Sequence, residues 1–367
     1  MVRDEPSRRS VITVVATLAG GVAVVGLMAL LATRTHPGAP ARFDALVATL
    51  VVGAPFALLW ILAAAGYGTA IVRPSAPGAA RAEAGLVVGV GIAVLLTVDA
   101  ALGALGVLHL GGGIGGWIVI AGGLGLLGRV VWHARRSELG GAPMDAIVWL
   151  AAPAVATLLV AACVAPGWLW ATEFGGYDAL SYHLGLPAEW VASGRLRPLE
   201  HNVYSALPNY VEGAYLHIDL LVGDAVRAAA SCQLLHAMFT LLGAWIVGRA
   251  AARLAMADDP GARSTVAAIA TALVLVTPWV VVVGSLAYDE AAVNLLLATA
   301  LLALVDPDIG PRRAAALAGV AAGAACGAKL TSVGFVVAPL VACLVITRPA
   351  RRWAPDLAMM MLGAAVV

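Results

Sequence analysis

The chain has 367 residues, of which 62% are hydrophobic and only 12% are charged, and its formal net charge is +1. A mean hydropathy of +0.94 and 41 glycines exclude an ordinary soluble domain, and the small net charge gives no sign of nucleic-acid binding. The four cysteines lie in hydrophobic stretches without CxxC spacing, so neither a disulfide framework nor a zinc site is expected. They are Cys163, Cys232, Cys326 and Cys343.

Apolar runs of about 18 or more residues indicate transmembrane helices. We expect about eleven, so the predicted fold class is an all-α polytopic bundle in a membrane. The expected spans are roughly 11–33, 45–71, 84–108, 112–132, 146–168, 228–252, 265–286, 289–305, 314–328, 330–347 and one from about 355. The ninth is short and rich in Gly and Ala, and is expected to be kinked or packed between neighbours. The last is still apolar at Val367, as in a truncated chain or a gene fragment.

Arginines determine the expected orientation, because basic residues favour cytoplasmic loops. Arg3, Arg8 and Arg9 precede the first span, which lacks a small-residue cleavage site and is interpreted as a retained helix rather than a signal peptide. With a cytoplasmic N-terminus and eleven spans, the arginine-rich loops fall inside, and the long loop 169–225 falls outside. The predicted location is a cell membrane, inner or plasma, crossed many times.

Two blocks are expected along the chain. Residues 1–140 form a four-helix membrane block with Asp99 as its notable intramembrane acid, and residues 141–367 hold the long external loop and most of the candidate chemistry. The basic, Gly- and Pro-containing stretch 135–144 is the expected boundary. Asp99 is either functional or hydrogen-bonded within its own block, and the role of this block stays open.

The long loop contains a polar segment, residues 173–187, in an otherwise apolar chain. Residues 178–193 predict a short helix, interrupted by Pro187 and stopped by Gly194. A second helical stretch, 211–218, follows a turn-rich connector. Acids, His and Tyr gathered directly after a hydrophobic helix are typical of a functional site in a membrane protein.

The string GYDALSYHLGLPAEWVASGRL (176–196), followed by VYSALPNYVEGAYL (203–216), carries a family resemblance. It resembles the first external loop of bacterial membrane glycosyltransferases of the GT-C superfold, relatives of the protein-O-mannosyltransferases and the lipid A aminoarabinose transferase. Residues 287–290 (AYDE) and 327–331 (GAKLT) are similar to that family's second acidic motif and Gly-x-Lys-x-Thr segment. The resemblance covers about 146–347, without the family's adjacent Asp-Glu pair in the first loop and without its C-terminal part.

The resemblance implies transfer of a hexosyl or pentosyl group from a polyprenyl-phosphate-linked donor to a lipid, glycan or protein acceptor on the external face. Such a reaction needs a base for the acceptor hydroxyl and positive charge for the leaving phosphate. Asp178 is the candidate base by its place in the motif, and a helix cap is its alternative role. Asp289 is the second catalytic candidate, although an acid at a helix N-terminus is also favoured by the helix dipole.

Six further residues are candidates for substrate binding: Glu173, Tyr182, His183, Arg195, Glu290 and Lys329. Lys329 is the single lysine of the chain, and either binds a lipid phosphate or extends toward the membrane interface. No cofactor is certain; a Mg or Mn ion shared by Asp178 and Asp289 is left open. The remaining histidines lack metal-ligand spacing and are assigned no role.

Two other classes of function compete with the transferase. A secondary transporter would use Asp99, Asp289 and Lys329 as coupling charges, but the sequence contains no inverted repeat. A non-catalytic membrane scaffold is the third hypothesis. The sequence leaves open the sugar, the acceptor, the metal dependence and the oligomeric state.

Overall fold

The computed structural model describes residues 43–72, 83–134, 146–169, 176–255 and 259–367, together with Gly20, Ala23, Gly26, Leu27 and Leu30. These residues form an all-helical fold in which the described ranges contain no strand beyond one isolated bridge between Leu199 and Asn202. Most of the first expected span, the expected boundary 135–144 and Glu173 lie outside the described residues.

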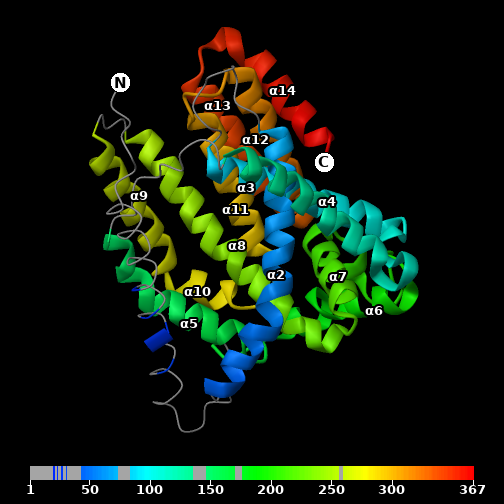
Figure 1. Ribbon diagram of the computed structural model, residues 1–367. Coiled ribbons are helices and arrows are strands. Elements are labelled where there is room, and N and C mark those ends of the chain that lie inside the picture. Colours follow the sequence, from blue (N-terminus) through cyan, green and yellow to red (C-terminus); the bar gives the residue numbers. More distant parts are fainter. Residues whose placement is uncertain are drawn as a thin grey trace.

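The main helices, labelled as in Figure 1, are α2 (Phe43–Ile71), α3 (Ala84–Ala104), α4 (Leu110–Ala134), α5 (Ala152–Ala162), α6 (Gly185–Ser193), α7 (Tyr210–Val222), α8 (Ala225–Leu254), α9 (Pro260–Leu275), α10 (Pro278–Gly284), α11 (Glu290–Val305), α12 (Pro311–Ala328), α13 (Ala338–Thr347) and α14 (Trp353–Ala365). The short 3-10 helices are η1 (Val107–His109), η2 (Ala146–Ala151), η4 (Val203–Ala206) and η6 (Ala350–Arg352), and the π-helices are η3 (Ala179–His183) and η5 (Val333–Val337).

Four of the described helices are long and apolar enough to cross a membrane: α2, α3, the stretch 107–132 and α8. Helices α9 and α10 form a fifth if the pair, bent by 68°, is counted as one span. Three shorter apolar helical segments accompany them, at 146–162, 290–305 and 333–347. The described chain therefore has the composition of a helical membrane protein, while the count of eleven spans stays a prediction.

Local sequence signals begin and end several of these helices. The side chain of Asp224 accepts a hydrogen bond from the N–H of Arg227 at the start of α8, and Asp259 caps α9, whose first residue is a proline. Such caps satisfy N–H groups that have no partner inside the helix. Gly194 confirms the expected stop after α6, because its positive φ of 77° allows the chain to leave the helix.

Two expected helices are interrupted where the sequence analysis assumed otherwise. The run 265–286 was expected as one span, but it breaks between α9 and α10 at Pro278, the first residue of α10. Proline lacks the N–H that would continue the helix and clashes with the preceding turn. The helix expected over 178–193 also changes geometry at Leu184, where the π-helix η3 ends, rather than at Pro187.

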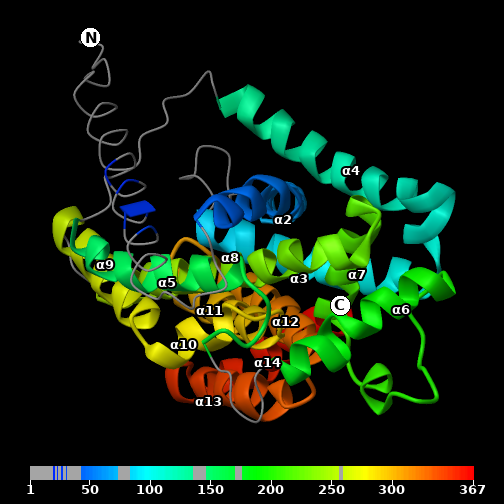
Figure 2. The same cartoon turned by 90° about the horizontal axis from the view of Figure 1, so that it is seen from below.

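The helices pack closely because small residues allow their backbones to approach. A Cβ added to Gly91 of α3 would lie 1.9 Å from the carbonyl oxygen of Ala64 in α2, and one added to Gly66 would lie 1.9 Å from that of Gly123 in α4. Small residues at crossings are typical of helix association in membranes. Helix α12 contacts α14, α11 and α3, as expected for the ninth span (Figure 2).

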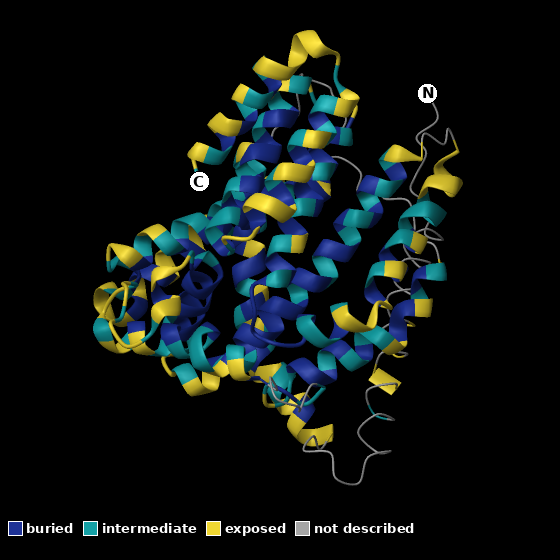
Figure 3. Ribbon diagram, turned by 180° about the vertical axis from the view of Figure 1, so that it is seen from behind, coloured by how far each residue is buried: buried dark blue, intermediate teal, exposed yellow. Residues whose placement is uncertain are grey.

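A buried polar network joins α7 to the helices near the N-terminus. Trp60 Nε1 donates to Asp99 Oδ2 at 2.7 Å, and His217 Nδ1 lies 2.8 Å from Asp99 Oδ1. His217 Nε2 lies 3.0 Å from the carbonyl oxygen of Gly116. The three side chains are fully buried. Figure 3 shows that buried segments make up much of the centre of the helical bundle. Asp99 therefore has one partner, Trp60, within the N-terminal block, as the hydrogen-bonding hypothesis predicted. Its second partner, His217 on α7, lies outside that block.

Candidate functional site

The π-helix η3 places the Tyr-His pair of the long loop. The N–H of Leu184 donates to the carbonyl oxygen of Ala179 at 2.8 Å, a five-residue spacing that widens the turn. Short π-helical turns are rare and occur frequently at functional sites. At the end of this turn the side chain of His183 is buried, whereas Leu180 is exposed.

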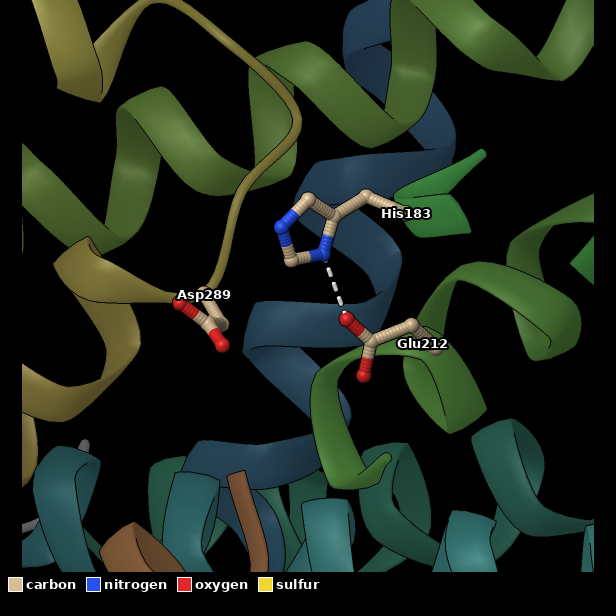
Figure 4. Close-up of side chains that lie close together, drawn as sticks. All are labelled: His183, Glu212 and Asp289. Carbon is tan, nitrogen blue, oxygen red and sulfur yellow. Dashed lines mark hydrogen bonds and ion pairs between the residues drawn. The ribbon is translucent and has the colours of Figure 1, made fainter. Parts of the chain in front are cut away.

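Three buried side chains from separate segments converge next to η3. His183 Nδ1 lies 2.5 Å from Glu212 Oε1 on α7, and Asp289, directly before α11, completes the group. One possible ligand atom from each of the three lies within 4.8 Å of the other two. Figure 4 shows the side chains turned toward one another. We refer to His183, Glu212 and Asp289 as the acid–histidine cluster.

Lys329 joins this cluster to a further carboxylate. Its Nζ donates to Asp289 Oδ1 at 2.8 Å and to Glu290 Oε1 at 2.6 Å. Lys329 follows the last residue of α12, so the ion pairs connect the C-terminal end of α12 to the N-terminal end of α11. An ammonium group has three N–H donors, and two of them are used here.

Three carboxyl groups, Glu212, Asp289 and Glu290, surround one lysine at the cluster. Burial, followed by the charge of Glu290, raises the pKa of Asp289 to about 7, so the net charge of the group depends on the protonation of Asp289 and His183. Burial alone would lower the pKa of His183, but the hydrogen bond and charge of Glu212, together with the charges of Asp289 and Glu290, outweigh it, and the pKa is raised. Two buried oxygens, Glu212 Oε2 and Glu290 Oε2, have no hydrogen-bond partner. Such orphaned oxygens favour a cation or a hydroxyl donor as ligand.

Aromatic rings line the approach to His183. The ring of Tyr182 stacks on that of Tyr204 with centroids 4.2 Å apart, and Tyr182 also lies 4.2 Å from the His183 ring. The ring centroids of Tyr288 and His183 are 5.2 Å apart. Burial, followed by the charge of Asp178, raises the pKa of the Tyr182 phenol. Tyr182 is therefore a neutral hydroxyl at physiological pH.

An apolar cavity of about 560 Å³ opens beside the carboxylates. Asp178, Tyr288 and Glu290 lie along its polar part, and most of the remaining wall consists of apolar side chains from α8, α9, α10 and α11. Two polar side chains, Thr240 of α8 and the exposed Asn294 of α11, lie among them. We call this cavity the apolar groove. It suits a ligand with a polar head and a long apolar tail.

The structure brings some of the predicted residues together and separates others. Asp178 lines the apolar groove and makes no capping hydrogen bond, so the helix-cap alternative has no support at this position. It does not belong to the acid–histidine cluster. Arg195 is exposed after α6, where its Cβ comes near Gly106 of the α3–α4 connection. Glu173 lies outside the described residues.

Glu212 and His236 are site residues that the sequence analysis passed over. His236 is buried on α8, and its Nε2 accepts a hydrogen bond of 3.1 Å from the N–H of Ala291 in the first turn of α11. It thereby helps to fix the start of the helix that carries Glu290. The available signal for Glu212 was an acid inside an apolar helical stretch, which is costly without a partner.

The acid–histidine cluster fits a divalent cation. One imidazole and two carboxylates suit Mn²⁺ or Zn²⁺, whereas Mg²⁺ prefers oxygen ligands alone. The orphaned oxygen of Glu212 and the presence of three carboxyl groups beside a single lysine agree with this chemistry. The metal-compatible group differs from the expected one, because it combines Asp289 with His183 and Glu212 rather than with Asp178.

Comparison with known proteins adds no family to this description. No protein-family model matches the chain, and neither the curated proteins nor the solved structures contain a match.

Proposed function

We propose that the chain is a membrane glycosyltransferase that moves a sugar from a polyprenyl-phosphate-linked donor to an acceptor hydroxyl. The observation that carries the proposal is the apolar groove, which has a mostly apolar wall and ends at Asp178 and Glu290. A polyprenyl-phosphate sugar has the matching division into a long apolar chain and a polar head. The resemblance of the loop around Asp178 to GT-C transferases points to the same class of reaction.

In the proposed reaction, the acceptor hydroxyl oxygen attacks the anomeric carbon of the donor sugar. Asp178 takes the hydroxyl proton, the new glycosidic bond forms, and the bond between the anomeric carbon and the phosphate oxygen breaks. The polyprenyl phosphate leaves with the electron pair of that bond. Asp178 suits the part of general base because it lines the groove while remaining partly accessible.

Lys329 has two parts in this scheme. Its two ion pairs hold Asp289 and Glu290 in place, and its third N–H donor is available to the leaving phosphate. A divalent cation held by His183, Glu212 and Asp289 would add positive charge for the same phosphate. Tyr182, Tyr204 and Tyr288 provide hydroxyls and ring faces with which a sugar can interact.

The test is sugar transfer from radiolabelled polyprenyl-phosphate sugars in membranes that contain the full chain. Asp178→Asn and Glu212→Gln should each lower transfer by about 10²-fold or more, the range typical of lost acid–base or electrostatic groups. Glu189→Gln is the matched control, since Glu189 is an exposed acid of the same loop, paired with His201. Equal transfer by wild type and Asp178→Asn would remove Asp178 from the chemistry.

A secondary transporter is the second candidate, because the pair of Asp99 and His217 is a buried ionisable group within the bundle. Transporters place such pairs along ion pathways. Counterflow of a solute that depends on Asp99, without transfer from any donor, would favour this candidate. Sugar transfer that survives in the Asp99→Asn variant would exclude Asp99 from the reaction.

A further inference from the structure

A second cavity, of about 400 Å³, lies between α8, α9 and η2. Helix α11 extends from the candidate site at one end to this second cavity at the other. The helix begins with Glu290 at the apolar groove, and Asp306, directly after it, lies 3.6 Å from Arg253 of the second cavity. Sixteen residues separate these ends, about 24 Å at 1.5 Å per residue. The hydrocarbon core of a bilayer is about 30 Å thick, so an α11 that crosses a bilayer would bring the second cavity near the headgroups of the leaflet opposite the candidate site.

Three arginines line this cavity. Arg249 and Arg253 belong to the last turns of α8, and Arg263 to the first turn of α9. Ser264 adds a hydroxyl beside them, and none of the described residues that line the cavity is acidic. Guanidinium groups present several N–H donors in one plane, which suits the oxygens of a phosphate.

The buried carboxylate of Glu83 binds two of these arginines. Arg249 donates to it through Nε and Nη2, both at 2.8 Å, and Arg253 donates through Nη2 at 3.2 Å. Arg253 also donates through Nη1 to Asp308 at 3.4 Å. A guanidinium has five N–H donors, so each arginine keeps others for a ligand. Fixing the planes in advance reduces the entropy lost when an anion binds.

The cavity also has an apolar part. Trp245 and Val148 contribute to its wall together with Ala267 and Ala268, and Leu273 on α9 is exposed on the outside of the bundle. A ligand in this cavity would therefore contact arginines in one part of the wall and apolar side chains in another part. This division matches a phospholipid, whose phosphate lies directly above its acyl chains.

We propose that this cavity binds the phosphate of an anionic phospholipid from the leaflet opposite the candidate site. The binding is independent of the glycosyltransferase proposal, because it uses other residues at the other end of α11. Arg263 contacts the headgroup in this arrangement, and the Glu83-held arginines receive its phosphate.

The test measures thermal unfolding of the purified full chain in detergent as lipid is added, since a ligand of the folded state raises the unfolding temperature with its concentration. The probes are phosphatidylglycerol, phosphatidylcholine and inorganic phosphate. The variant is Arg263→Gln, which leaves the contacts of Glu83 intact. Arg351→Gln is the control, because Arg351 is an exposed arginine on η6 that does not line the cavity.

Phosphatidylglycerol should stabilise the wild type at lower concentration than phosphatidylcholine. Arg263→Gln should weaken this effect at least about tenfold, as expected from the loss of one hydrogen bond between charged groups, and Arg351→Gln should match wild type. Equal stabilisation by the two lipids, or an unchanged response of Arg263→Gln, would overturn the proposal. Stabilisation by inorganic phosphate as strong as that by phosphatidylglycerol, and equally dependent on Arg263, would overturn the assignment to a lipid.

Discussion

Replacement of Asp99 by alanine should destabilise the bundle more than any other single change in its polar network. Asp99 accepts hydrogen bonds from Trp60 and pairs with His217, and all three side chains are fully buried. Asp99→Ala therefore leaves the buried indole N–H of Trp60 and the buried Nδ1 of His217 without their partner, while His217 Nε2 keeps its contact with Gly116. Removing one member of a buried charged pair costs about 3–5 kcal/mol of the free energy of unfolding.

Trp60→Phe provides the comparison, because it removes one hydrogen bond and keeps the pair of Asp99 and His217. A single hydrogen bond contributes about 0.5–1.5 kcal/mol, and values near 0.6 kcal/mol are typical between membrane helices. The double variant Asp99→Ala/His217→Ala removes both charges, so its cost should fall below the sum of the single costs by about 0.5–3 kcal/mol.

The assay is unfolding of the purified chain by titration of mixed micelles with a denaturing detergent, followed by circular dichroism. Two results would refute the reasoning. In the first, Asp99→Ala costs no more than Trp60→Phe, which would mean that the pair with His217 contributes little. In the second, the costs of Asp99→Ala and His217→Ala add fully, which would mean that the two groups do not interact.

Three further predictions concern other parts of the molecule. Gly91→Ala should lower the free energy of unfolding by about 1–3 kcal/mol through overpacking, because the added Cβ would lie 1.9 Å from a backbone oxygen of α2. Gly125 has open space around it, so Gly125→Ala should leave the free energy of unfolding unchanged in the same detergent titration. Lys329→Met should abolish sugar transfer and Lys329→Arg should retain part of it, because only the arginine keeps a cation beside Asp289 and Glu290. Equal activity of the two variants would contradict this prediction. Because the pKa of His183 is raised, its pair with Glu212 stabilises the metal-free fold fully below about pH 6.5 and loses this contribution as pH rises through the raised pKa. Binding of Mn²⁺, which needs a neutral ring, should tighten over that same rise in calorimetric titrations. His183→Gln should reduce the pH dependence of both measurements and leave the part that comes from Asp289, whose pKa burial raises to about 7.

Apolar length predicted most of the described helices. The runs expected at 45–71, 84–108 and 228–252 correspond to α2, α3 and α8 within a few residues, because spanning segments need uninterrupted hydrophobicity. The proline at position 278 is itself a sequence signal for a helix break, but the apolar residues on both sides of it led to the prediction of one continuous span. The change of geometry at Leu184 carried none, since a π-turn depends on tertiary packing as well as on composition.

The sequence was less informative about the site. Asp289 and Lys329 stood out as charges between apolar runs, and the structure pairs them across 40 residues. Glu212 and His183 are separated by 29 residues, and a single sequence contains no distance information that would join them. Asp99 was recognised as an intramembrane acid, but its partner His217 lies 118 residues away and had been assigned no role. The partners of these residues therefore follow only from the fold, whereas the sequence already indicated that each buried charge would cost free energy without a partner.

The most direct test of the account is to map where a polyprenyl phosphate binds, using a photoreactive analogue with a diazirine in its isoprenoid chain. After irradiation in membranes, peptides would be sequenced by mass spectrometry, with and without an excess of unlabelled lipid. The account predicts label on groove residues such as Val247 and Leu301, and loss of that label under competition. Label to the same extent on exposed apolar residues outside the groove, such as Val51 and Val52, and insensitive to competition, would contradict it.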